Sequence, residues 1–593
     1  MPADTILKRL FDRAASHPTA PAYCAKRGGV WVPTGYGAYA DHVRRAGKAL
    51  IALGCQPGGT VSILGYNRPE WVVFDLACMA IGGAPAGIYT TSSPSEARYI
   101  IHHAESPVVL VENAAQWEKV RKERANLPHL RWVVTMEGTT IDDPMVLTWE
   151  QFLSKGSAVP DADFFARMHA LEPGNMATLI YTSGTTGPPK GVMLSHENLA
   201  WTATTAAREA GSIHPGDCNL SYLPLSHIAE QIVTIHGPIT AGSTVYYAES
   251  LDKVPANLRE VRPTIFFGVP RIWEKFHAGI TAKLGEATGT KKRIAHWALR
   301  VGSRVNDLRM RSARVPRRLA LQHRLADRLV FSKMKAALGL DRARICVTGA
   351  APLAKEVIEF FGSIDVMLLE GYGLSETAGT GTLNHPGAVR IGTVGTCARG
   401  FELKIAGDGE ILVRGRNVFL GYYKDPTATA EALADGFLHT GDLGSLDAKG
   451  FVSITGRKKE IIITAGGKNV APTNIEAALK NHPLVSEAIV IGDRRKYLTV
   501  LITLDGEAAV RFRGERALND DAAHPDHPAI LAEVQRALDA VNGDLAHVEQ
   551  VKKFRILNAP FSIETGELTP TLKLKRSVVA SKFADEIESM YGG

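Results

Sequence analysis

The sequence predicts an α/β protein with a large N-terminal domain of βα-layered sheets, a β-rich subdomain and a small mobile α+β C-terminal domain. In the first part of the chain, short β-branched runs at 61–64, 107–112 and 264–269 alternate with helical stretches, which is typical of parallel sheets covered by helices. From about residue 400 the pattern changes to strands separated by glycines, which favours antiparallel structure. After Gly456 a further helix and strand pattern indicates a separate small unit.

These changes of pattern give the domain boundaries. We expect an N-terminal domain at 1–458 and a small C-terminal lid domain at 459–593. Inside the N-terminal domain we expect a helical basic insertion at about 276–342 and the β-rich subdomain at about 395–458. A chain of 593 residues has room for several domains of roughly 100 to 200 residues. Its content of 45% hydrophobic and 22% charged residues excludes a largely disordered protein.

The sequence shows no zinc cluster and no export signal. The six cysteines lie singly, without a CxxC pair or a close Cys/His cluster, so we expect buried thiols in a reducing, cytoplasmic compartment. The N-terminal segment carries charges every few positions and lacks the apolar core of a secretory signal. The longest apolar stretch, at 71–89, is interrupted by Asp75, two glycines and a proline. We interpret it as a buried helix followed by a strand, not as a membrane span.

The net charge of +7, from 68 Lys and Arg against 61 Asp and Glu, is concentrated in one segment. Residues 291–344 hold 16 Lys and Arg and three Asp, a local charge of +13 that leaves the remainder of the chain at −6. We expect this helical segment to rest peripherally on the inner surface of an anionic membrane. A solvated face or a homodimer surface is the alternative. No nucleic-acid-binding motif accompanies the charge, so nucleic acid is not an expected partner.

The strongest local motif is a glycine- and hydroxyl-rich loop, YTSGTTGPPKG, at 181–191. Its small residues let the backbone approach an anion closely and offer N–H and O–H donors, as a phosphate requires. A Walker A loop would need Gly at position 189 and Ser or Thr at position 191, where this chain has Pro189 and Gly191. The two adjacent prolines also disfavour a smooth turn into a helix. The sequence therefore predicts a phosphate-binding loop of another type.

Further motifs follow this loop in order along the chain. They are SYLPLSH at 221–227, GAAP at 349–352, EGYGLSET at 370–377, LHTGDL at 438–443 and GRKKE at 456–460. Together with the loop, these segments resemble the adenylate-forming superfamily of acyl-CoA synthetases, luciferases and nonribosomal adenylation domains. The resemblance extends over essentially the whole chain and implies a large AMP-binding domain followed by a mobile lid.

The resemblance implies where ATP binds, and the chemistry of the residues agrees. Two glycines free the backbone around Tyr372, whose face can stack on adenine, and Thr377 offers a hydroxyl to a phosphate. The Asp442 carboxylate can accept both ribose hydroxyls, and the Arg457 guanidinium offers a fork of donors to ribose or phosphate oxygens. The nucleotide-binding residues implied are Thr182, Ser183, Gly184, Thr186, Gly187, Lys190, Gly349, Ala350, Ala351, Glu370, Gly371, Tyr372, Gly373, Thr377, Asp442 and Arg457.

The resemblance also implies a catalytic group made of Thr185, His227, Glu376 and Lys573. Glu376 supplies a hard carboxylate oxygen suited to Mg²⁺ as the metal ligand, and His227 an imidazole beside the acyl carboxylate. Lys573 falls in the ending LTPTLKLKR, where the family has a lysine that reaches the substrate carboxylate and the α-phosphate. Leu572 stands where the family usually has glycine before that lysine.

Other segments indicate a fatty-acid substrate and CoA as acceptor. The stretches VRPTIFFGVPRIWEK at 261–275 and SYLPLSHIAEQ at 221–231, with the chain's ending, resemble long-chain fatty acyl-CoA synthetases, particularly the bubblegum-type branch. This resemblance implies adenylation of a fatty acid by ATP with Mg²⁺, followed by transfer of the acyl group to CoA. Between the two steps the lid would turn about Lys459 and present the loop of Gly466 and Gly467 to the pantetheine arm.

Alternatives to this function stay open at the level of sequence. One is an acyl-AMP ligase that delivers the acyl group to a carrier protein, and another is a luciferase-like monooxygenase. A non-catalytic binder of fatty acid or nucleotide is disfavoured because the residues implied for catalysis and nucleotide binding are intact. Some long-chain members gate the acyl tunnel with an aromatic residue after the histidine. This chain has Ala-Glu-Gln at 229–231, so we expect no gate of that type.

Overall fold

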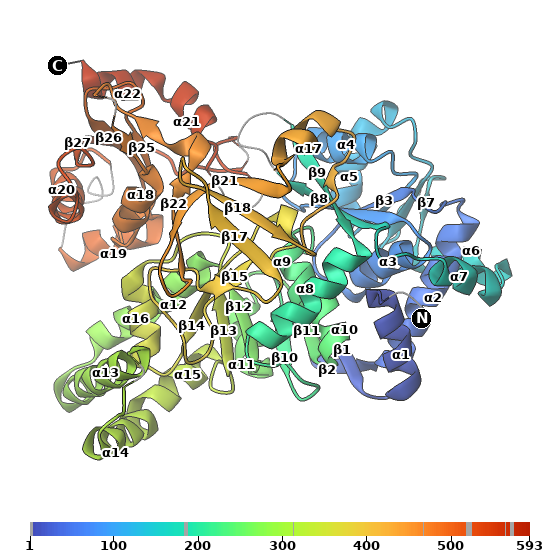
Figure 1. The fold of residues 1–593 in the computed structure, drawn as a ribbon, viewed down its shortest axis with the longest axis horizontal. Helices are drawn as coiled ribbons and strands as arrows, with labels where there is room; N and C mark the ends of the chain where they lie inside the picture. The colour runs from blue at the N-terminus through green and yellow to red at the C-terminus, as the bar shows by residue number, and fades with distance from the viewer. Residues whose placement is uncertain are drawn as a thin grey trace.

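The computed structural model describes residues 4–182, 188–311, 313–466, 468–516, 525–563, 565–569 and 574–592. It consists of a large body of sheets and helices and a smaller C-terminal unit, which lies at the upper left of Figure 1. The predicted α/β class with a large N-terminal part is confirmed. Among the described residues, no helix combines the length and the apolar character needed to cross a membrane.

The first layer of the large body is an eight-stranded sheet in the order β19-β9-β8-β4-β3-β5-β6-β7. Its strands are β3 (Thr60–Leu64), β4 (Ala84–Ile88), β5 (Val108–Val111), β6 (Trp132–Thr135), β7 (Val146–Leu147), β8 (Met176–Thr182), β9 (Lys190–Ser195) and β19 (Gly421–Tyr422). Helices α2 (Tyr36–Ala52) and α3 (Pro69–Ala80) cover one face, and α4 (Pro94–His103) and α5 (Ala114–Glu123) cover the other. Because both faces are covered, β3 and β4 are buried at every position.

Two further sheets complete the strand layers around the centre of the molecule. One has the order β10-β11-β1-β2 and the other β12-β13-β14-β15-β16. Their strands are β1 (Pro21–Arg27), β2 (Val30–Gly35), β10 (Cys218–Ser221), β11 (Thr244–Tyr247), β12 (Ile265–Gly268), β13 (Ile345–Thr348), β14 (Leu368–Tyr372), β15 (Thr382–Leu383) and β16 (Thr396–Cys397). The helices beside them include α1 (Ile6–Ser16), α8 (His196–Glu209), α11 (Val254–Val261) and α16 (Lys355–Ser363).

These sheets are mixed, whereas the alternation of strands and helices predicted parallel ones. The central strands are parallel, as between β3 and β4 and between β12 and β13. Antiparallel pairs lie toward the edges, where β1 meets β2 and β8 meets β9. Only two residues separate β1 from β2, and so short a connection can join only antiparallel neighbours. The β8–β9 pair brings the two ends of the predicted phosphate loop, Thr182 and Lys190, directly opposite each other.

The segment between β12 and β13 is helical. It contains α12 (Pro270–Glu286), α13 (Gly289–Met310), α14 (Arg317–Ala326), the π-helical turn η4 (Asp327–Phe331) and α15 (Ser332–Leu338). Buried side chains of α13 and η4, including Val301 and Phe331, join the core that includes α16. In Figure 1 these helices form the lower left lobe, below the C-terminal unit.

An antiparallel sheet connects the large body to the C-terminal unit. Its order is β17-β18-β21-β20, and β22 pairs with β21. The strands are β17 (Phe401–Ile405), β18 (Glu410–Gly415), β20 (Leu433–Ala434), β21 (Phe437–Leu446) and β22 (Val452–Arg457), with α17 (Pro426–Ala432) beside them. The chain leaves β22 through a 3-10 turn, Lys458–Glu460, and enters the C-terminal unit.

The C-terminal unit has its own apolar cores on the two sides of a three-stranded sheet, β25-β26-β27. Its strands are β23 (Ile462–Ile463), β24 (Asn469–Val470), β25 (Val485–Ile491), β26 (Leu498–Leu504) and β27 (Val551–Ile556), and its helices are α18 (Pro472–Lys480), α19 (Gly506–Glu515), α20 (Pro528–Gly543), α21 (Arg576–Lys582) and α22 (Ala584–Tyr591). Val500 and Ile502 of β26 face one core, whereas Leu501 between them faces the other, as the two-residue period of a strand requires.

One ionisable side chain lies unpaired inside the main core. Asp75 of α3 is 1% exposed, and neither of its carboxyl oxygens has a hydrogen-bond partner among the described residues. Burial raises the pKa of Asp75 well above its usual range, because a charge is strongly disfavoured in an apolar interior. The native protein therefore keeps a proton that the unfolded chain releases above about pH 4. The contribution of this group to stability is greatest below its unfolded pKa and falls as the pH rises toward the folded pKa.

We predict that Asp75→Asn makes the free energy of unfolding less dependent on pH, because asparagine keeps the shape but cannot ionise. Above about pH 4, where the unfolded chain releases the proton and the folded protein keeps it, the wild type should lose up to about 1.4 kcal/mol per pH unit more than the variant. Urea unfolding of both proteins at several pH values measures the difference. Parallel pH dependences would contradict a neutral Asp75 in the folded state.

Candidate active site

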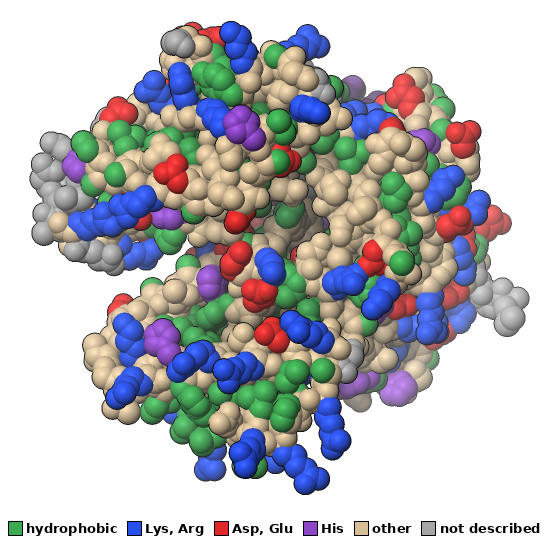
Figure 2. Space-filling view, turned by 60° about the vertical axis from the view of Figure 1, so that its left-hand side comes forward, with side chains coloured by type: hydrophobic (Ala, Val, Ile, Leu, Met, Phe, Trp, Pro, Cys, Tyr) green, Lys and Arg blue, Asp and Glu red, His purple; other side chains and the backbone are tan. Residues whose placement is uncertain are grey.

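A cavity of about 2640 Å³ lies between the sheets of the large body and the C-terminal unit. Figure 2 shows the hollow between an upper and a lower lobe of the molecule. Strands β8, β13, β14 and β22 end at this cavity, so motifs that are far apart in the sequence meet there. The predicted site residues that line it are Thr182, Lys190, His227, Gly349, Ala350, Ala351, Glu370, Gly371, Tyr372, Gly373, Glu376, Asp442, Arg457 and Lys459.

The other predicted site residues either lie outside the described residues or do not line the cavity. Ser183, Gly184, Thr185, Thr186, Gly187, Gly467 and Lys573 lie outside the described residues. Gly466 is exposed, and it is not among the residues that line the cavity. Thr377 is only 1% exposed, and its hydroxyl accepts from the Leu374 N–H at 2.9 Å and donates to the Leu374 carbonyl at 3.2 Å. The structure thus differs from the expectation that Thr377 donates to a phosphate, because this hydroxyl is used within its own turn.

A buried carboxylate organises the corner of the cavity where the nucleotide motifs meet. Asp442 is 3% exposed. Its Oδ2 accepts from the Tyr372 hydroxyl at 2.7 Å, and its Oδ1 lies 3.0 Å from Nε of Arg457. The pairing of β21 with β22 sets Asp442 opposite Arg457. Each carboxylate oxygen keeps a second lone pair, so the pair of oxygens can accept two neighbouring hydroxyls.

Burial shifts the pKa values of two ionisable side chains at this corner, Tyr372 and Glu370. Burial, followed by the negative charge of Asp442, raises the pKa of Tyr372 well above its usual range. Tyr372 is therefore neutral and remains a hydrogen-bond donor. At the start of the same motif, burial raises the pKa of Glu370 to about 7, and its Oε2 has no partner among the described residues. Glu370 is thus poised between its neutral and charged forms.

A second carboxylate, Glu376, is held by a residue that the motifs did not indicate. The Tyr422 hydroxyl donates to Oε1 of Glu376 at 2.8 Å, and burial, followed by the charge of Glu376, raises the pKa of Tyr422. The ammonium of Lys190 lies 4.8 Å from the centre of the Tyr422 ring and 3.9 Å from Asp425. Tyr422 belongs to β19, which pairs with β9, and no local pattern in the sequence connects those two segments.

The described residues contain no cluster of three or more His, Cys, Asp or Glu that could enclose a metal ion. Glu376 nevertheless fits one kind of metal site. Mg²⁺ in nucleotide enzymes is commonly held by one or two carboxylates together with the phosphates and water. Glu376 lines the cavity, and among the described residues only Tyr422 hydrogen-bonds its carboxylate, through Oε1. Its other oxygen can therefore face such an ion.

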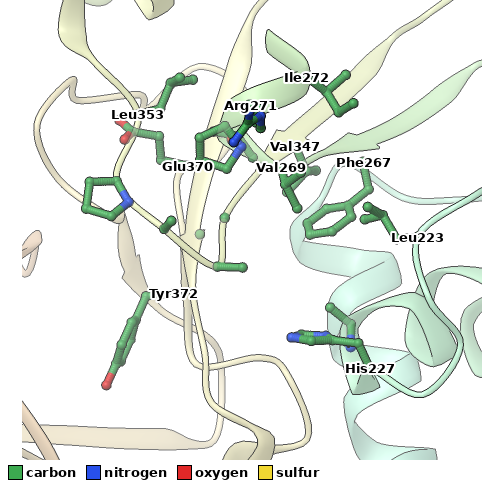
Figure 3. Close-up of a pocket in the computed structure, with 18 of the residues that line it drawn as sticks. Leu223, His227, Phe267, Val269, Arg271, Ile272, Val347, Leu353, Glu370 and Tyr372 are labelled. Atoms are coloured by element: carbon green, nitrogen blue, oxygen red, sulfur yellow. The ribbon is translucent and has the colours of Figure 1, made fainter. Parts of the chain in front are cut away.

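His227 marks the apolar side of the cavity. Figure 3 shows His227 together with Leu223 and Phe267, across the cavity from Tyr372. His227 caps the short helix α9 (Ile228–Gln231), and its Nδ1 accepts from the Ala229 N–H at 3.2 Å. A neutral ring in this position carries its proton on Nε2. The imidazole therefore has a fixed tautomer and orientation at the cavity wall.

Beyond His227 the cavity has a long apolar wall. On one side it follows α8, whose small side chains leave space, and on the other it follows β12 and β13. The lining residues of this part are Ala203, Ala206, Ala207, Ala210, Ile265, Phe267, Ile345 and Val347. We call this apolar part of the cavity the slot; its alanines and large apolar side chains give it a lining that suits a hydrocarbon.

The C-terminal unit contributes its last motif to the cavity. Leu574, Lys575 and Arg576 line it, and Nζ of Lys575 lies 3.9 Å from Glu96 at the start of α4. Arg576 is fixed by an ion pair with the buried Glu476. In this arrangement Leu574, Lys575 and Arg576 face the cavity, and the exposed Gly466 does not.

Comparison with known proteins agrees with this geometry. The protein family described as AMP-binding enzyme matches residues 10–423. The family described as AMP-binding enzyme C-terminal domain matches residues 459–593. Long-chain-fatty-acid–CoA ligase ACSBG2 of Xenopus laevis is 38% identical over 626 residues, which cover 100% of this chain and 84% of the relative. Long-chain-fatty-acid–CoA ligase FadD15 of Mycobacterium bovis is 38% identical over 599 residues, covering 99% of this chain and 97% of the relative.

Solved structures show the same fold at low sequence identity. The anthranilate CoA ligase AuaEII in complex with anthranoyl-AMP matches with a TM-score of 0.73 at 19% identity, covering 100% of this chain and 99% of the other. A fatty acyl CoA synthetase of Mycobacterium tuberculosis matches with a TM-score of 0.63 at 21% identity, covering 98% and 99%. The resemblance that the motifs indicated is confirmed, and the chain belongs to the AMP-binding enzyme family.

Proposed function

We propose that this protein is an ATP-dependent long-chain fatty acyl-CoA ligase, which converts fatty acid, ATP and CoA to acyl-CoA, AMP and diphosphate. One observation carries the proposal: a single cavity joins the polar corner of Asp442 and Tyr372 to the apolar slot beyond His227. A carboxylate at the end of a hydrocarbon chain in that slot would meet the nucleotide near His227. The names of the relatives agree with this substrate and acceptor.

In the first half-reaction a carboxylate oxygen of the fatty acid attacks the α-phosphorus of ATP, and the bond to diphosphate breaks. Tyr372 would stack on adenine and Asp442 would accept the ribose hydroxyls. The phosphate loop from Thr182 to Lys190 would bind the phosphates through Ser183, Gly184, Thr185, Thr186 and Gly187. Glu376 would hold Mg²⁺, which when bound neutralises charge on the phosphates. Positive charge on Lys573 would act in the same way on the oxygens of the reacting phosphorus.

In the second half-reaction the thiol of CoA attacks the acyl carbonyl carbon and AMP leaves. We propose that residues 459–593 form the lid for this step and turn about Lys459, which lies in an exposed 3-10 turn. The turn would withdraw Lys573 and bring the Gly466–Gly467 loop to the pantetheine arm. Glycines in that loop leave room for a narrow ligand close to the backbone.

We predict AMP and acyl-CoA release that depends on a long-chain fatty acid, ATP and CoA together. An assay over acids of graded chain length, with aromatic acids included, measures the substrate range. Because Asp442→Ala removes the acceptor shared by Tyr372 and Arg457, it should raise KM for ATP by about 10-fold or more. KM for the fatty acid should change far less in this variant.

Each alternative function predicts a different result in the same assay. Release of acyl-AMP without acyl-CoA would indicate an acyl-AMP ligase that serves a carrier protein. Oxygen consumption would indicate a monooxygenase. No diphosphate exchange dependent on any of the acids would indicate a non-catalytic binder and contradict the proposal.

The two half-reactions can be separated at the last motif. Lys573→Ala should reduce acyl-AMP formation by at least about 100-fold, because it removes positive charge that acts on the transition state. Thioester formation from supplied acyl-AMP and CoA should be retained. Lys575→Ala is the matched control, since Lys575 is two positions away and faces Glu96 at 3.9 Å. An equal loss of both half-reactions in Lys573→Ala would refute the assigned role.

We propose further that the lower lobe contacts an anionic membrane, from which fatty acid would be drawn. Leu321, Leu325 and Leu329 are 68%, 50% and 40% exposed, and their spacing of four places them on one side of the helix that runs from α14 into η4. We call these three residues the leucine row. The exposed arginines beside it are Arg317, Arg318, Arg324 and Arg328. Figure 2 shows Lys and Arg side chains over the lower lobe with hydrophobic side chains between them.

This surface has the chemistry of an interfacial helix. Apolar side chains enter the boundary between headgroups and acyl chains, while the arginines contact the phosphates. Each basic side chain near an anionic membrane contributes about 1 kcal/mol, and salt weakens that attraction. Exposed leucines in a row lower the solubility of a protein, and a basic face that only contacts solvent does not need them.

We predict that the protein binds vesicles of phosphatidylcholine and phosphatidylglycerol more tightly than vesicles of phosphatidylcholine alone. Serine at all three positions of the leucine row should lower vesicle binding by about 10-fold or more. Leu446→Ser is the control, because Leu446 is 43% exposed in β21, away from this face. Flotation assays measure binding, and analytical ultracentrifugation of the same proteins measures oligomeric state. Unchanged flotation with loss of a dimer would assign the surface to a second copy instead.

A further inference from the structure

A buried glutamate lies directly behind the turn that carries His227. Glu230 belongs to α9, is 2% exposed and is among the residues that line the cavity. Its backbone N–H donates to the carbonyl of His227 at 3.1 Å, so the two residues share one turn of helix. The helix then continues as a π-helical turn, η3 (Ile232–His236). Such turns are rare and occur frequently at functional sites.

One oxygen of Glu230 accepts every hydrogen bond that its carboxyl group receives from the described residues. Oε1 accepts from the hydroxyls of Ser221 at 2.7 Å and Thr234 at 2.8 Å. It also accepts from the Tyr222 N–H at 3.2 Å and from Nδ2 of Asn67 at 3.3 Å. These donors come from the end of β10, from η3 and from the turn after β3. A single atom therefore joins three separate segments behind the cavity wall.

The same donors connect to each other and to the wall. Nδ2 of Asn67 also donates to Oγ of Ser221 at 2.8 Å and to the carbonyl of Leu223 at 2.7 Å. Leu223 and His227 both line the apolar side of the cavity, as Figure 3 shows. The network around Glu230 thus ends on the two residues that would lie nearest to the carboxylate end of a fatty acid.

The charge of Glu230 is not what holds this network. Burial raises the pKa of Glu230 to about 8, so the carboxyl group is largely neutral at physiological pH. The carbonyl-type oxygen Oε1 accepts equally well in a neutral acid and in an amide. Removing that acceptor would leave two hydroxyls and a backbone N–H buried without a partner, and each such group costs about 1 to 3 kcal/mol.

We propose that Glu230 is a positioning residue for the fatty acid: its Oε1 fixes the turn of His227 and the adjoining wall against β10 and the turn after β3. It acts through these neighbours and does not touch the reacting atoms. Without the acceptor, α9 would be free to shift relative to β10, and the slot would lose its shape at the end where the carboxylate lies. The nucleotide corner at Asp442 belongs to other strands and would be unaffected. This inference rests on the proposed function for its substrate.

Two variants of the full chain test the proposal. Glu230→Met keeps the length of the side chain and removes the acceptor, whereas Glu230→Gln keeps an oxygen at the position of Oε1. Asp75→Asn is the matched control, because it also alters a buried carboxyl group, in α3. Steady-state kinetics give KM for fatty acid and for ATP separately. Equilibrium binding of a fluorescent long-chain fatty acid gives a second measurement that does not depend on turnover.

We predict that Glu230→Met raises KM for the fatty acid and weakens binding of the fluorescent probe by about 10-fold, with KM for ATP changed less than about 2-fold. Glu230→Gln should stay within about 3-fold of the wild type in both measurements, because the acceptor is restored. Probe binding by Glu230→Met equal to that of Asp75→Asn would overturn the proposal. Equal losses for ATP and fatty acid would do the same, since they indicate a general loss of structure. Equal impairment of Glu230→Gln would show that the charge is required.

Failure of the variant to fold does not remove the test. If thermal unfolding shows that Glu230→Met is not folded at the assay temperature, Ser221→Ala removes one donor and keeps Glu230. It should shift fatty-acid binding in the same direction by about 3-fold, and no shift would overturn the proposal. A wild type that binds the probe but forms no acyl-CoA would refute the proposed function alone, because the effect of Glu230→Met on probe binding would still be measurable.

Discussion

The buried carboxylate of Asp442 is the interaction on which the geometry of the cavity depends. Tyr372 comes from the end of β14, in a sheet of the large body, and Arg457 ends the strand that leads to the C-terminal unit. A charge that is 3% exposed has to be paired or hydrogen-bonded, and Asp442 is satisfied only when both neighbours are in place. These contacts therefore fix together the Tyr372 ring that would face a planar base, the Asp442 carboxylate that would accept the ribose hydroxyls, and the start of the chain that leads to Lys459.

Three carboxyl groups that line the cavity, those of Asp442, Glu376 and Glu230, lie in three different environments. Asp442 has the Arg457 guanidinium 3.0 Å from its Oδ1 and the Tyr372 hydroxyl 2.7 Å from its Oδ2. Glu376 meets a tyrosine hydroxyl and is left accessible to a cation in the cavity. Burial raises the pKa of Glu230 to about 8, although the neutral donors around it act in the opposite direction. Environment thus separates the proposed ribose acceptor, the proposed metal ligand and the proposed hydrogen-bonding anchor, which share one chemical group.

The sequence was sufficient for the fold class and for the part of the site that consists of contiguous motifs. EGYGLSET and GRKKE each place several of the predicted residues on one strand or turn, LHTGDL places Asp442 on β21, and all three segments reach the cavity. Tyr422 and Glu230 were not predicted as site residues, because their partners are 46 and up to 163 positions away in the chain. Thr377 shows the converse, since its residue type suits a phosphate but its hydroxyl is used by the local turn. The leucine row required the structure, because exposure decides whether a helical leucine is core or surface.

The contact between the C-terminal unit and the large body suits the change of orientation that we propose for this unit. Among the described residues no apolar core spans the two: the cores of the large body end at Val452, and those of the C-terminal unit begin at Ile462. Polar contacts cross between them, including Lys575 to Glu96 at 3.9 Å and Arg271 to Glu487 at 3.3 Å. The cationic partner of each pair is open to water, with Arg271 46% and Lys575 27% exposed, so water can solvate the cation when a rotation breaks the contact. Leu574, Lys575 and Arg576 line the cavity while Gly466 does not, so in the proposed mechanism this orientation would serve adenylation and a second orientation would serve thioester formation. The proposed half-reactions would therefore be separated in time by the geometry of the unit itself.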